Sequence, residues 1–408
     1  MIVNNVKPIS LTSARNFVEN ADISFSFEKV HFTESLGKVI AEDIISDINV
    51  PDFDKSPLDG YAFKKEDVIF ATKDSPVTLD VIDVIMAGDV SDKVINSKQA
   101  VRIMTGAKVP NGADCIVRYE DTEFNEKYVK IFSPVKTDNI IKLGEDIQKG
   151  DILIKKDSVI TPVEVGVLAS LGISYISVYK TPNVAVFSTG SELLDVDEPM
   201  EDGKIRNSNS YTMEQLAKIY GATVTQGKKV SDDLESLVYT YKKLLENNDI
   251  VVSTGGISVG DSDFVMTALE KVGVKTIFSR VSAKPGGHVF FGTYNEKFVF
   301  ALSGNPAAAF MNFYLYVRPL ILRYQHKNSC NKKVSSKLIN SFSKKAKVNR
   351  ILRANTFYNE GQYFTELEDR QNSGVLSSMI GKNSIVILPE NTEFKKDDIV
   401  EVEFIYGY

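Results

Sequence analysis

Between residues 183 and 279 the sequence alternates short apolar runs with helix-length patterns, and this alternation constrains the fold more than any other feature. The predicted strands are 183–188, 222–226, 249–253 and 274–279. The predicted helices are 209–221, 232–247, 263–273 and 304–324. Apolar strands that alternate with helices indicate a parallel sheet with helices on both faces. The sequence therefore predicts a doubly wound α/β domain in this region.

The segments on either side of this region do not alternate strands with helices in this way. Residues 51–134 consist of short strand-like pieces separated by turns, as in a small β domain. A helix is predicted at 162–171, and Thr161 suits its N-cap position. After Gln325 the chain is rich in Lys, Ser and Asn and then resumes as short alternating strands, which predicts a terminal all-β domain.

Composition and charge exclude several classes of function. A chain of 408 residues with 43% hydrophobic and 25% charged residues is typical of a soluble protein of roughly two to four domains. The net charge of -6 argues against a general nucleic-acid binder. The stretch Lys327–Arg353 contains no acid, and we interpret it as a solvated linker and strand edge, about three to one over a nucleic-acid patch.

The same kind of argument places the protein in the cytoplasm. The longest apolar run, AAAFMNFYLYV, is too short to span a membrane, and the first residues lack the pattern of a signal peptide. Cys115 and Cys330 are far apart and belong to no metal-binding motif. His31, His288 and His326 are scattered, which argues against a zinc site.

Five loops are expected to carry the ligand site. In an open α/β sheet, ligands bind beyond the carboxyl ends of the strands. This rule selects the loops STGSEL, KVSDDLE, STGGISVGDSDF, SRVSAKPGGH and LSGNPAA. The glycine and serine N–H groups of the third loop are suited to phosphate. No GK[ST] follows this loop and no strand leads into GxGxxG, so the P-loop and dinucleotide assignments are weak.

Three of these loops place an acid near a strand end: Glu192, Asp232 and Asp263. Each acid alone has a structural explanation, because Asp232 stands three residues before Glu235 as in a capping box and Asp263 opens a helix. Glu192 would suit a helix dipole, and for any single acid we favour such a structural role. Together the three would suit Mg²⁺, with positions left for water and a ligand phosphate.

The fourth loop places two cations four residues apart, Arg280 and Lys284. An ordinary surface position is the alternative interpretation for Lys284. The flanking Pro285, Gly286 and Gly287 favour contact with an oxyanion.

Seven motifs occur in the order of one known family. They are FDKSPLDGYAF, RIMTGAKVPNGADCIVRYEDT, GEDIQKGD, STGSEL, STGGISVGDSDF, KPGG and SGNPAA, and the segment NSGVLSSMIGKNSIVILPE follows them. Over essentially its whole length the sequence resembles the molybdopterin molybdenumtransferase family, relatives of the enzymatic half of gephyrin. It differs where the family commonly has lysine at Arg280 and Lys-Pro at Gly287 and His288.

The resemblance implies a multidomain α/β plus β fold. Residues 1–50 and 135–180 would form an elongated N-terminal dimerisation region, with 51–134 as an inserted small β domain. Residues 181–325 would form the α/β molybdopterin-binding domain and 326–408 a C-terminal β-barrel. The family forms homodimers in which two subunits share an active site.

The resemblance also implies an activity, in which molybdate and adenylylated molybdopterin react with Mg²⁺ to give molybdenum cofactor and AMP. The implied partners are the pterin substrate, molybdate, a molybdopterin adenylyltransferase and recipient molybdoenzymes, without nucleic acid or membrane. Two kinds of alternative use the same α/β domain. One is a molybdopterin-binding scaffold, and the other is a different enzyme: an adenylyltransferase, a pyrophosphatase or a deamidase. The scaffold would tolerate loss of the strand-end acids, and the enzymes would lack the DGYA and MTGA portions.

Motif matching extends the candidate site to Asp59, Thr105 and Asp146, although Asp59 and Thr105 also suit ordinary turns. The expected catalytic residues are Asp59, Glu192, Asp232, Asp263 and Lys284, of which Glu192, Asp232 and Asp263 would hold the metal. The residues expected to bind the pterin substrate and molybdate are Thr105, Asp146, Thr189, Gly190, Gly255, Gly256, Ser258, Gly260, Arg280, Pro285, Gly286, Ser303, Asn305 and Pro306.

Overall fold

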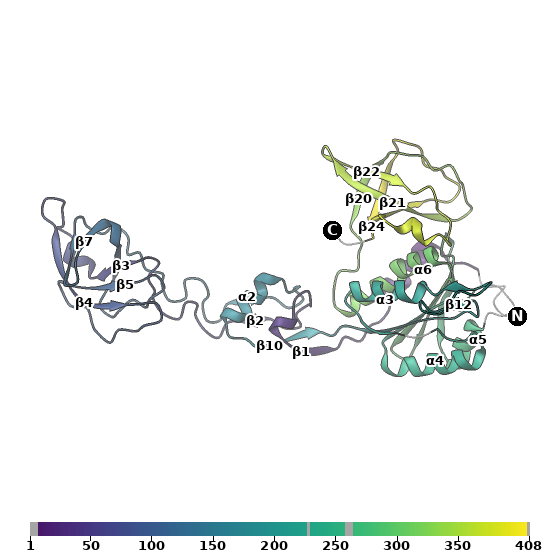
Figure 1. Cartoon of the computed structure of the whole chain (residues 1–408), viewed down its shortest axis with the longest axis horizontal. Coiled ribbons are helices and arrows are strands. Elements are labelled where there is room, and N and C mark those ends of the chain that lie inside the picture. Colours follow the sequence, from purple (N-terminus) through teal and green to yellow (C-terminus); the bar gives the residue numbers. More distant parts are fainter. Residues whose placement is uncertain (1–6, 227–228, 258–263, 406–408) are drawn as a thin grey trace. The chain divides into compact units, whose positions relative to one another are not determined.

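The structure is a computed structural model of the chain, and it describes residues 7–226, 229–257 and 264–405 (Figure 1). It divides into two compact units. Unit 1 contains Met1–Glu28 and Tyr179–Tyr408, and unit 2 contains Lys29–Val178. Unit 1 combines an α/β domain with a β-barrel, and unit 2 contains a smaller β-sheet domain.

A six-stranded sheet with the order β14-β11-β15-β19-β18-β16 forms the centre of unit 1. Its strands are β11 (Asn183–Ser188), β14 (Thr223–Gln226), β15 (Ile250–Thr254), β16 (Lys275–Arg280), β18 (His288–Tyr294) and β19 (Lys297–Leu302). The parallel arrangement predicted for β14, β11 and β15 is confirmed, and β19 extends it. β18 runs antiparallel to both of its neighbours, so the prediction of a wholly parallel sheet is wrong at the β16 edge.

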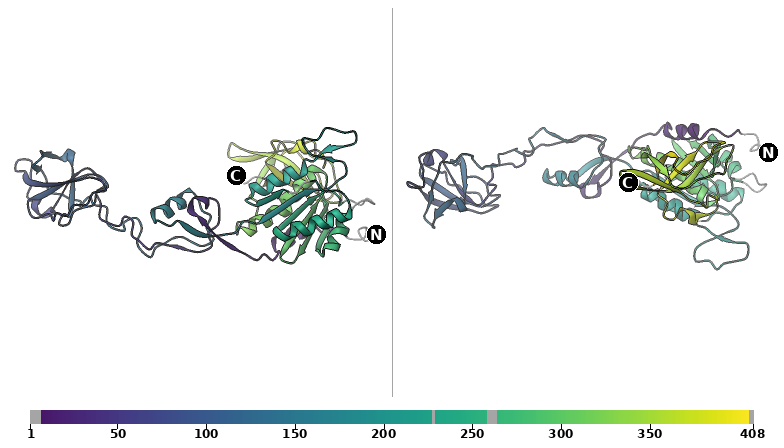
Figure 2. Two further views of the ribbon diagram at one scale, coloured as in Figure 1. Left: turned by 60° about the horizontal axis from the view of Figure 1, so that its bottom comes forward. Right: turned by 90° about the horizontal axis from the view of Figure 1, so that it is seen from above.

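Helices cover both faces of this sheet, as predicted (Figures 1 and 2). Val184 and Val186 of β11 belong to the core on one face, and Ala185 and Phe187 belong to the core on the other. The first face packs against α1 (Leu11–Glu19), α3 (Asn209–Ile219), α6 (Pro306–Asn312) and α7 (Arg318–Tyr324). The second face packs against α4 (Leu234–Asn247) and α5 (Val265–Val272). None of the helices in the described parts of the chain is long and apolar enough to cross a membrane.

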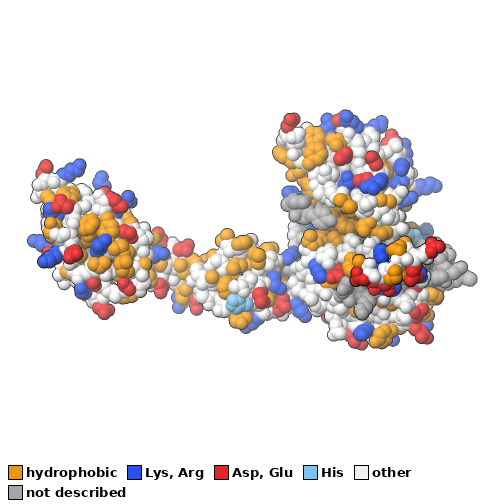
Figure 3. Space-filling model, in the orientation of Figure 1, with side chains coloured by type: hydrophobic (Ala, Val, Ile, Leu, Met, Phe, Trp, Pro, Cys, Tyr) orange, Lys and Arg blue, Asp and Glu red, His pale blue; other side chains and the backbone are white. Residues whose placement is uncertain are grey.

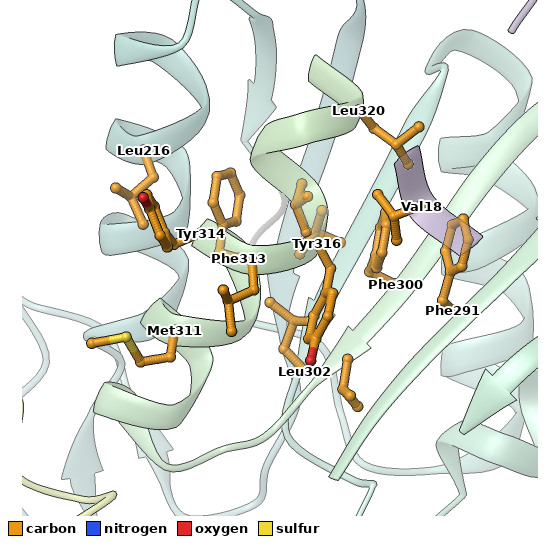
Figure 4. Close-up of a cluster of buried hydrophobic side chains, with 14 of the residues drawn as sticks. Val18, Leu216, Phe291, Phe300, Leu302, Met311, Phe313, Tyr314, Tyr316 and Leu320 are labelled. Atoms are coloured by element: carbon orange, nitrogen blue, oxygen red, sulfur yellow. The ribbon is translucent and has the colours of Figure 1, made fainter. Parts of the chain in front are cut away.

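The larger core lies on the face that contacts α3 and α6 (Figure 4). The rings of Phe291 and Phe300 stack there with their centroids 4.6 Å apart, and Tyr316 is fully buried in the same core. The single helix predicted at 304–324 is divided into α6, a π turn at Phe313–Val317, and α7. Pro319 has no N–H to donate to the carbonyl four residues earlier, which accounts for the irregular turn before it.

The C-terminal part of unit 1 is a closed five-stranded β-barrel, as predicted. Its strands are β20 (Lys333–Leu338), β21 (Asn349–Asn359), β22 (Gln362–Leu367), β23 (Ser384–Leu388) and β24 (Ile399–Phe404). The strands follow the order β21-β22-β20-β24-β23, and β23 pairs again with β21. The two-residue strand β17 (Ala283–Lys284) of the α/β domain pairs with Asn349 and Arg350 of β21. This pairing fixes the barrel beside the KPGG loop.

Unit 2 contains a second six-stranded sheet, with the order β6-β3-β5-β4-β8-β7. Its strands are β3 (Gly60–Phe63), β4 (Val77–Ile85), β5 (Gln99–Ile103), β6 (Cys115–Arg118), β7 (Thr122–Phe124) and β8 (Tyr128–Ile131). The remaining elements are β1 (Phe27–His31), which pairs with β10 (Tyr175–Tyr179), β2 (Ile44–Ile45), which pairs with β9 (Ile152–Ile154), and α2 (Pro162–Ser170). Thr161 caps α2 in a capping box with Glu164, which confirms the predicted cap.

Candidate functional site

The strand order of the unit 1 sheet reverses at β11 and β15. From β11 the sheet continues to β14 on one side, and from β15 it continues to β19 on the other. Loops that leave the carboxyl ends of such strands diverge, and this is where ligands bind in open α/β sheets. A pocket of about 670 Å³ opens here, and we call it the strand-end pocket. It contains residues that follow β11, β15 and β19.

The loop after β11 brings an acid to this pocket. Thr189 is buried, and its N–H donates to the carbonyl of Thr254 at 2.9 Å. The exposed Glu192 lines the pocket. Its Oε2 lies 2.7 Å from the place where a Cβ at Gly190 would stand, so the carboxylate lies directly against this glycine. The predicted residues Thr189, Gly190 and Glu192 thus lie together.

The loop after β15 approaches the same place through two glycines. Gly255 and Gly256 have φ values of 93° and 63°, in the left-handed region that favours glycine. A Cβ at Gly255 would stand 2.2 Å from the carbonyl oxygen of Thr189. The Gly255 N–H donates to the carbonyl of Leu302 at 3.1 Å, so this predicted phosphate donor is engaged within the sheet. The other predicted residues of this loop, Ser258, Gly260 and Asp263, lie outside the described residues.

The acid predicted in the KVSDDLE loop is not the cap of α4. Asp233 occupies the N-cap position, where its Oδ1 accepts the N–H of Ser236 at 2.8 Å. The capping-box interpretation of Asp232 is therefore wrong by one residue. Asp232 instead accepts a hydrogen bond from Oγ1 of Thr189 at 3.3 Å, and its Oδ1 is 3.5 Å from the Cβ position of Gly256. Asp232 thus lies between the loops that follow β11 and β15.

A second pocket, of about 850 Å³, adjoins the first. The two pockets share His288, Ser303 and Asn305. Two of these residues, Ser303 and Asn305, are predicted site residues, and His288 is not.

The second pocket is lined by cations, and we call it the cationic pocket. Arg280, Lys284, Lys344 and Arg350 line it, and no carboxylate among the described residues does. Both predicted cations are present. Lys344 and Arg350 were not predicted, and they come from the basic stretch of the barrel, whose surface shows many lysine and arginine side chains in Figure 3. The absence of acids from that stretch was the only signal for them in the sequence.

The KPGG loop forms one side of the cationic pocket. Lys284, Pro285 and Gly286 all line it. Gly286 has a φ of 89°, and a Cβ there would stand 2.3 Å from Oδ1 of the buried Asn312. Glycine is therefore required at this position for the loop to pass α6.

The SGNP loop and the first turn of α6 join the two pockets. Asn305 occupies the N-cap position, but its side chain makes no capping hydrogen bond. The N–H of Asn305 donates to Oγ of Ser303 at 3.2 Å. The N–H groups of Ala307 and Ala308 donate to the carbonyl of Ser373, at 2.9 and 3.3 Å. The barrel thus supplies the cap of α6.

The structure also reveals Arg206 in the strand-end pocket, a residue that sequence reasoning missed. Residues 195–204 form a loop between two short strands, β12 (Leu193–Leu194) and β13 (Ile205–Arg206), which pair in parallel at its base. Nη1 of Arg206 donates to the carbonyls of Asp195 and Glu198, and these bonds attach the start of the loop to β13. An arginine in a polar segment carries no distinguishing pattern, so no signal pointed to it.

Three predicted residues belong to unit 2: Asp59, Thr105 and Asp146. Oδ1 of Asp59 accepts hydrogen bonds from both the N–H and the hydroxyl of Thr105, each at 2.7 Å. These bonds stabilise the charged carboxylate and lower the pKa of Asp59 below its ordinary value. Asp146 is exposed, and its backbone N–H donates to the carbonyl of Val50 at 3.0 Å.

The described residues supply only part of the predicted metal site. Within residues 7–226, 229–257 and 264–405 no group of three or more His, Cys, Asp and Glu side chains is close enough to hold an ion. Glu192 lies against Gly190 in the loop after β11, and Asp232 lies between the loops after β11 and β15. The third predicted ligand, Asp263, is outside the described residues. Carboxylates are the ligands that Mg²⁺ prefers, so the donor chemistry fits this ion and the three-acid set stays a prediction.

Comparisons with known proteins agree with this architecture. Residues 9–172 match the family described as the MoeA N-terminal region (domain I and II). Residues 185–323 match the probable molybdopterin binding domain, and residues 336–405 match the MoeA C-terminal region (domain IV). The chain is similar to a crystal structure of molybdopterin biosynthesis moea protein from Pyrococcus horikosii, with a TM-score of 0.85 and 29% identity over 98% of this chain and 100% of that chain.

Similarity to curated proteins extends over nearly the full length. The molybdopterin molybdenumtransferase of Staphylococcus epidermidis is 36% identical over 405 residues, which cover 98% of this chain and 97% of that protein. The enzyme of the same name from Staphylococcus aureus is 37% identical over 410 residues, with the same coverage of each chain. Identity at this level across every domain shows that the chain belongs to the molybdopterin molybdenumtransferase family, transferases of molybdenum cofactor biosynthesis.

Proposed function

We propose that this protein transfers molybdenum from molybdate to adenylylated molybdopterin, with Mg²⁺-dependent release of AMP. One observation carries the proposal: a pocket rich in cations adjoins a strand-end pocket that contains an acid, and the two share His288, Ser303 and Asn305. An enzyme that joins an oxoanion to a phosphate-containing pterin needs both kinds of environment within reach of each other.

The cationic pocket is the proposed molybdate site. Molybdate is a tetrahedral dianion, and hydrogen bonds from charged donors to an oxyanion are stronger than neutral ones. Arg280 and Lys284 come from the α/β domain, and Lys344 and Arg350 come from the barrel, so the anion would be held from two directions. The exclusion of carboxylates from the described lining removes the repulsion that an anion would otherwise meet.

The strand-end pocket is the proposed site of the adenylylated pterin. Thr189, Gly255 and Gly256 give it a backbone surface without bulky side chains, which lets a phosphate approach closely. When bound, Mg²⁺ would neutralise negative charge on the departing AMP. Glu192 and Asp232 would hold the ion together with Asp263, and Lys284 would orient the oxoanion toward the pterin.

We also propose that the active form is a cytoplasmic homodimer. In it, Asp59, Thr105 and Asp146 of one protomer would act at the strand-end pocket of its partner. The proposed domains are 1–50 with 135–180, 51–134, 181–325 and 326–408. A molybdopterin adenylyltransferase would supply the substrate, and apo-molybdoenzymes would receive the product.

Purified protein mixed with adenylylated molybdopterin, Mg²⁺ and molybdate provides the test. We expect AMP release that requires molybdate, together with the appearance of cofactor that activates an apo-molybdoenzyme. Lys284→Ala is expected to lower turnover by about 100-fold at low molybdate concentration. If the pterin binds but AMP release does not depend on molybdate, the protein is a scaffold or a hydrolase and the proposal is wrong.

A further inference from the structure

One loop of the barrel reaches both pockets. Gln371, Asn372 and Ser373 line the cationic pocket, and the next residue, Gly374, lines the strand-end pocket. We call residues 370–374 the wall loop. It belongs to the barrel in sequence, yet it contributes to pockets that open at the ends of strands in the α/β domain.

The wall loop is attached to the α/β domain through its backbone. The carbonyl of Ser373 accepts the N–H groups of Ala307 and Ala308 in the first turn of α6. These two N–H groups would otherwise be available to an anion, because the first N–H groups of a helix have no partner within the helix. The wall loop therefore occupies the end of α6, and a ligand in either pocket meets the loop there.

A single side chain of the barrel holds the wall loop from behind. Nη2 of Arg353, on β21, donates to the carbonyls of Arg370 at 2.6 Å and Asn372 at 3.2 Å. The Gln371 side chain closes the other half of this clamp. It accepts the N–H of Arg353 at 3.1 Å and donates to the carbonyls of Arg353 and Glu368, at 2.9 and 2.8 Å.

Strand geometry explains why Arg353 faces the loop and not the barrel interior. Side chains alternate along a strand. Leu352 and Ala354 of β21 belong to the barrel core, whereas Ile351 belongs to the core of the α/β domain. Arg353 shares the side of the strand with Ile351, so its guanidinium lies on the face of β21 that is directed out of the barrel.

The position of Arg353 is costly to the fold. The side chain is fully buried, and its Nε and Nη1 have no hydrogen-bond acceptor within the described residues. Burial lowers the pKa of Arg353 to about 10. A buried cation with unmet donors is often less stable than an apolar side chain of similar size. Nε and Nη1 of Arg353 contribute no hydrogen bond in the part of the chain that the structure describes, so we attribute the arginine to the loop that its Nη2 holds.

We propose that Arg353 is a positioning residue for the oxoanion: it fixes the wall loop against α6 and thereby sets the affinity of the cationic pocket. Arg353 does not itself line this pocket. Its effect passes through the two carbonyls that its Nη2 holds. The Gln371 side chain bonds to the backbone of residue 353, so these bonds are kept in Arg353→Met. The inference rests on the proposed function, because it assumes that molybdate binds in this pocket.

The test compares Arg353→Met with Arg353→Lys in the full-length protein, using molybdate alone to measure binding and AMP release from the complete reaction to measure KM. Methionine fills the space without donating, and lysine restores the charge and one hydrogen bond. Lys337→Met is the matched control, because Lys337 lies on β20 of the same barrel and, among the described residues, forms an ion pair only with the exposed Asp397. Titration calorimetry gives the Kd for molybdate, and amide hydrogen exchange reports the protection of the Ala307 and Ala308 N–H groups.

For Arg353→Met we expect an increase of about tenfold in the Kd and KM for molybdate. The KM for the pterin substrate should stay within about twofold of wild type, and the melting temperature should not fall. Exchange at Ala307 and Ala308 should accelerate while the β15 amides stay protected. Arg353→Lys should recover part of the molybdate affinity, and Lys337→Met should match wild type.

Two results would overturn the inference. One is an Arg353→Met protein whose wall loop exchanges freely but whose molybdate affinity is unchanged. The other is a protein that fails to fold with methionine and, with lysine, folds less stably but binds molybdate normally, since this indicates a purely structural role. A wild-type protein that binds molybdate without inserting it contradicts the proposed function and leaves this inference standing.

Discussion

At the scale of the residue, the contact between Asp59 and Thr105 shows how two predicted site residues act as one group. Both donors of Thr105 bind the same carboxylate oxygen, and they lower the pKa of Asp59. Because the folded-state pKa is below the unfolded value of 3.8, the stabilisation from this contact is complete above that pH. It is lost as the pH falls through the folded-state pKa, so the carboxylate stays charged at neutral pH.

Thr105→Val should raise the pKa of Asp59 toward its ordinary value. Valine removes the hydroxyl donor and keeps the backbone N–H, so only part of the shift should be lost. Carboxyl NMR titration measures it. Thr122→Val is the control, because the Thr122 hydroxyl donates to the carbonyl of Tyr119 and does not contact Asp59. An unchanged Asp59 pKa in Thr105→Val would show that the hydroxyl does not stabilise the carboxylate.

Two neighbouring aspartates should have separate effects. Asp233 caps α4, whereas Asp232 contacts Thr189 beside the strand-end pocket. Asp233→Ala should lower the melting temperature and leave the KM for the pterin substrate unchanged. Asp232→Ala should keep the melting temperature near wild type and lower turnover by about 100-fold. Thermal unfolding and AMP release measure both, and the reverse pattern would restore the capping role of Asp232.

Local sequence predicts caps well only where one candidate is present. Thr161 precedes Pro162 and is the predicted N-cap, and the structure adds a capping box with Glu164. In the KVSDDLE loop two adjacent aspartates compete, and the spacing to Glu235 favours the wrong one. The place of Lys344 and Arg350 beside Lys284 could not be predicted, because it depends on the pairing of β17 with β21. Such a long-range pairing leaves no local pattern.

At the scale of the element, one ion pair connects the N-terminal helix to the barrel. Nη1 of Arg15 on α1 lies 2.8 Å from Oε1 of Glu403 on β24, and the Glu403 side chain is only 4% exposed. Burial alone would raise the pKa of Glu403. The hydrogen bonds and charge of Arg15, with help from Asn331 and Lys333, bring it below its ordinary value.

Arg15→Met should therefore cost about 3 kcal/mol of unfolding free energy, because it leaves the Glu403 carboxylate buried without its main partner. Urea unfolding measures this cost. The double variant Arg15→Met, Glu403→Leu is the control and should recover most of the loss, since it removes the unpaired charge. The extra unfolding free energy of wild type is fully present above the ordinary pKa of glutamate. It is lost as the pH falls through the lowered pKa of Glu403. A cost independent of pH would point to packing alone.

Strand prediction fails at the hairpin of β18 and β19, where no helix separates consecutive strands. β18 and β19 are apolar along most of their length because helices cover both faces of the sheet, so neither strand shows the alternation of a half-buried strand. The turn between them contains Asn295 with a φ of 53°, a conformation that asparagine tolerates. β11 and β15 are buried to the same extent, but each precedes a helix-length pattern, so the prediction finds them and misses the hairpin.

At the scale of the whole molecule, the two units have separate hydrophobic cores. The core clusters around Ile40, Phe63 and Ile103 contain only residues of unit 2, and those around Phe300 and Phe187 contain only residues of unit 1. Both pockets are lined only by residues of unit 1. The chain crosses between the units only twice, near residues 28 and 178. Each unit is thus expected to fold without the other.

Removal of unit 2 should separate binding from turnover. Replacement of residues 29–178 by a short Gly-Ser turn is feasible, because the N–H of Lys180 donates to the carbonyl of Ser26 at 2.9 Å. The shortened chain should keep molybdate affinity within about threefold, since the cationic pocket is intact, while AMP release falls by about 1,000-fold or more. Calorimetry and AMP assays measure the two effects, with Thr122→Val in the full chain as a control. Turnover near wild type would show that Asp59, Thr105 and Asp146 contribute nothing to the chemistry.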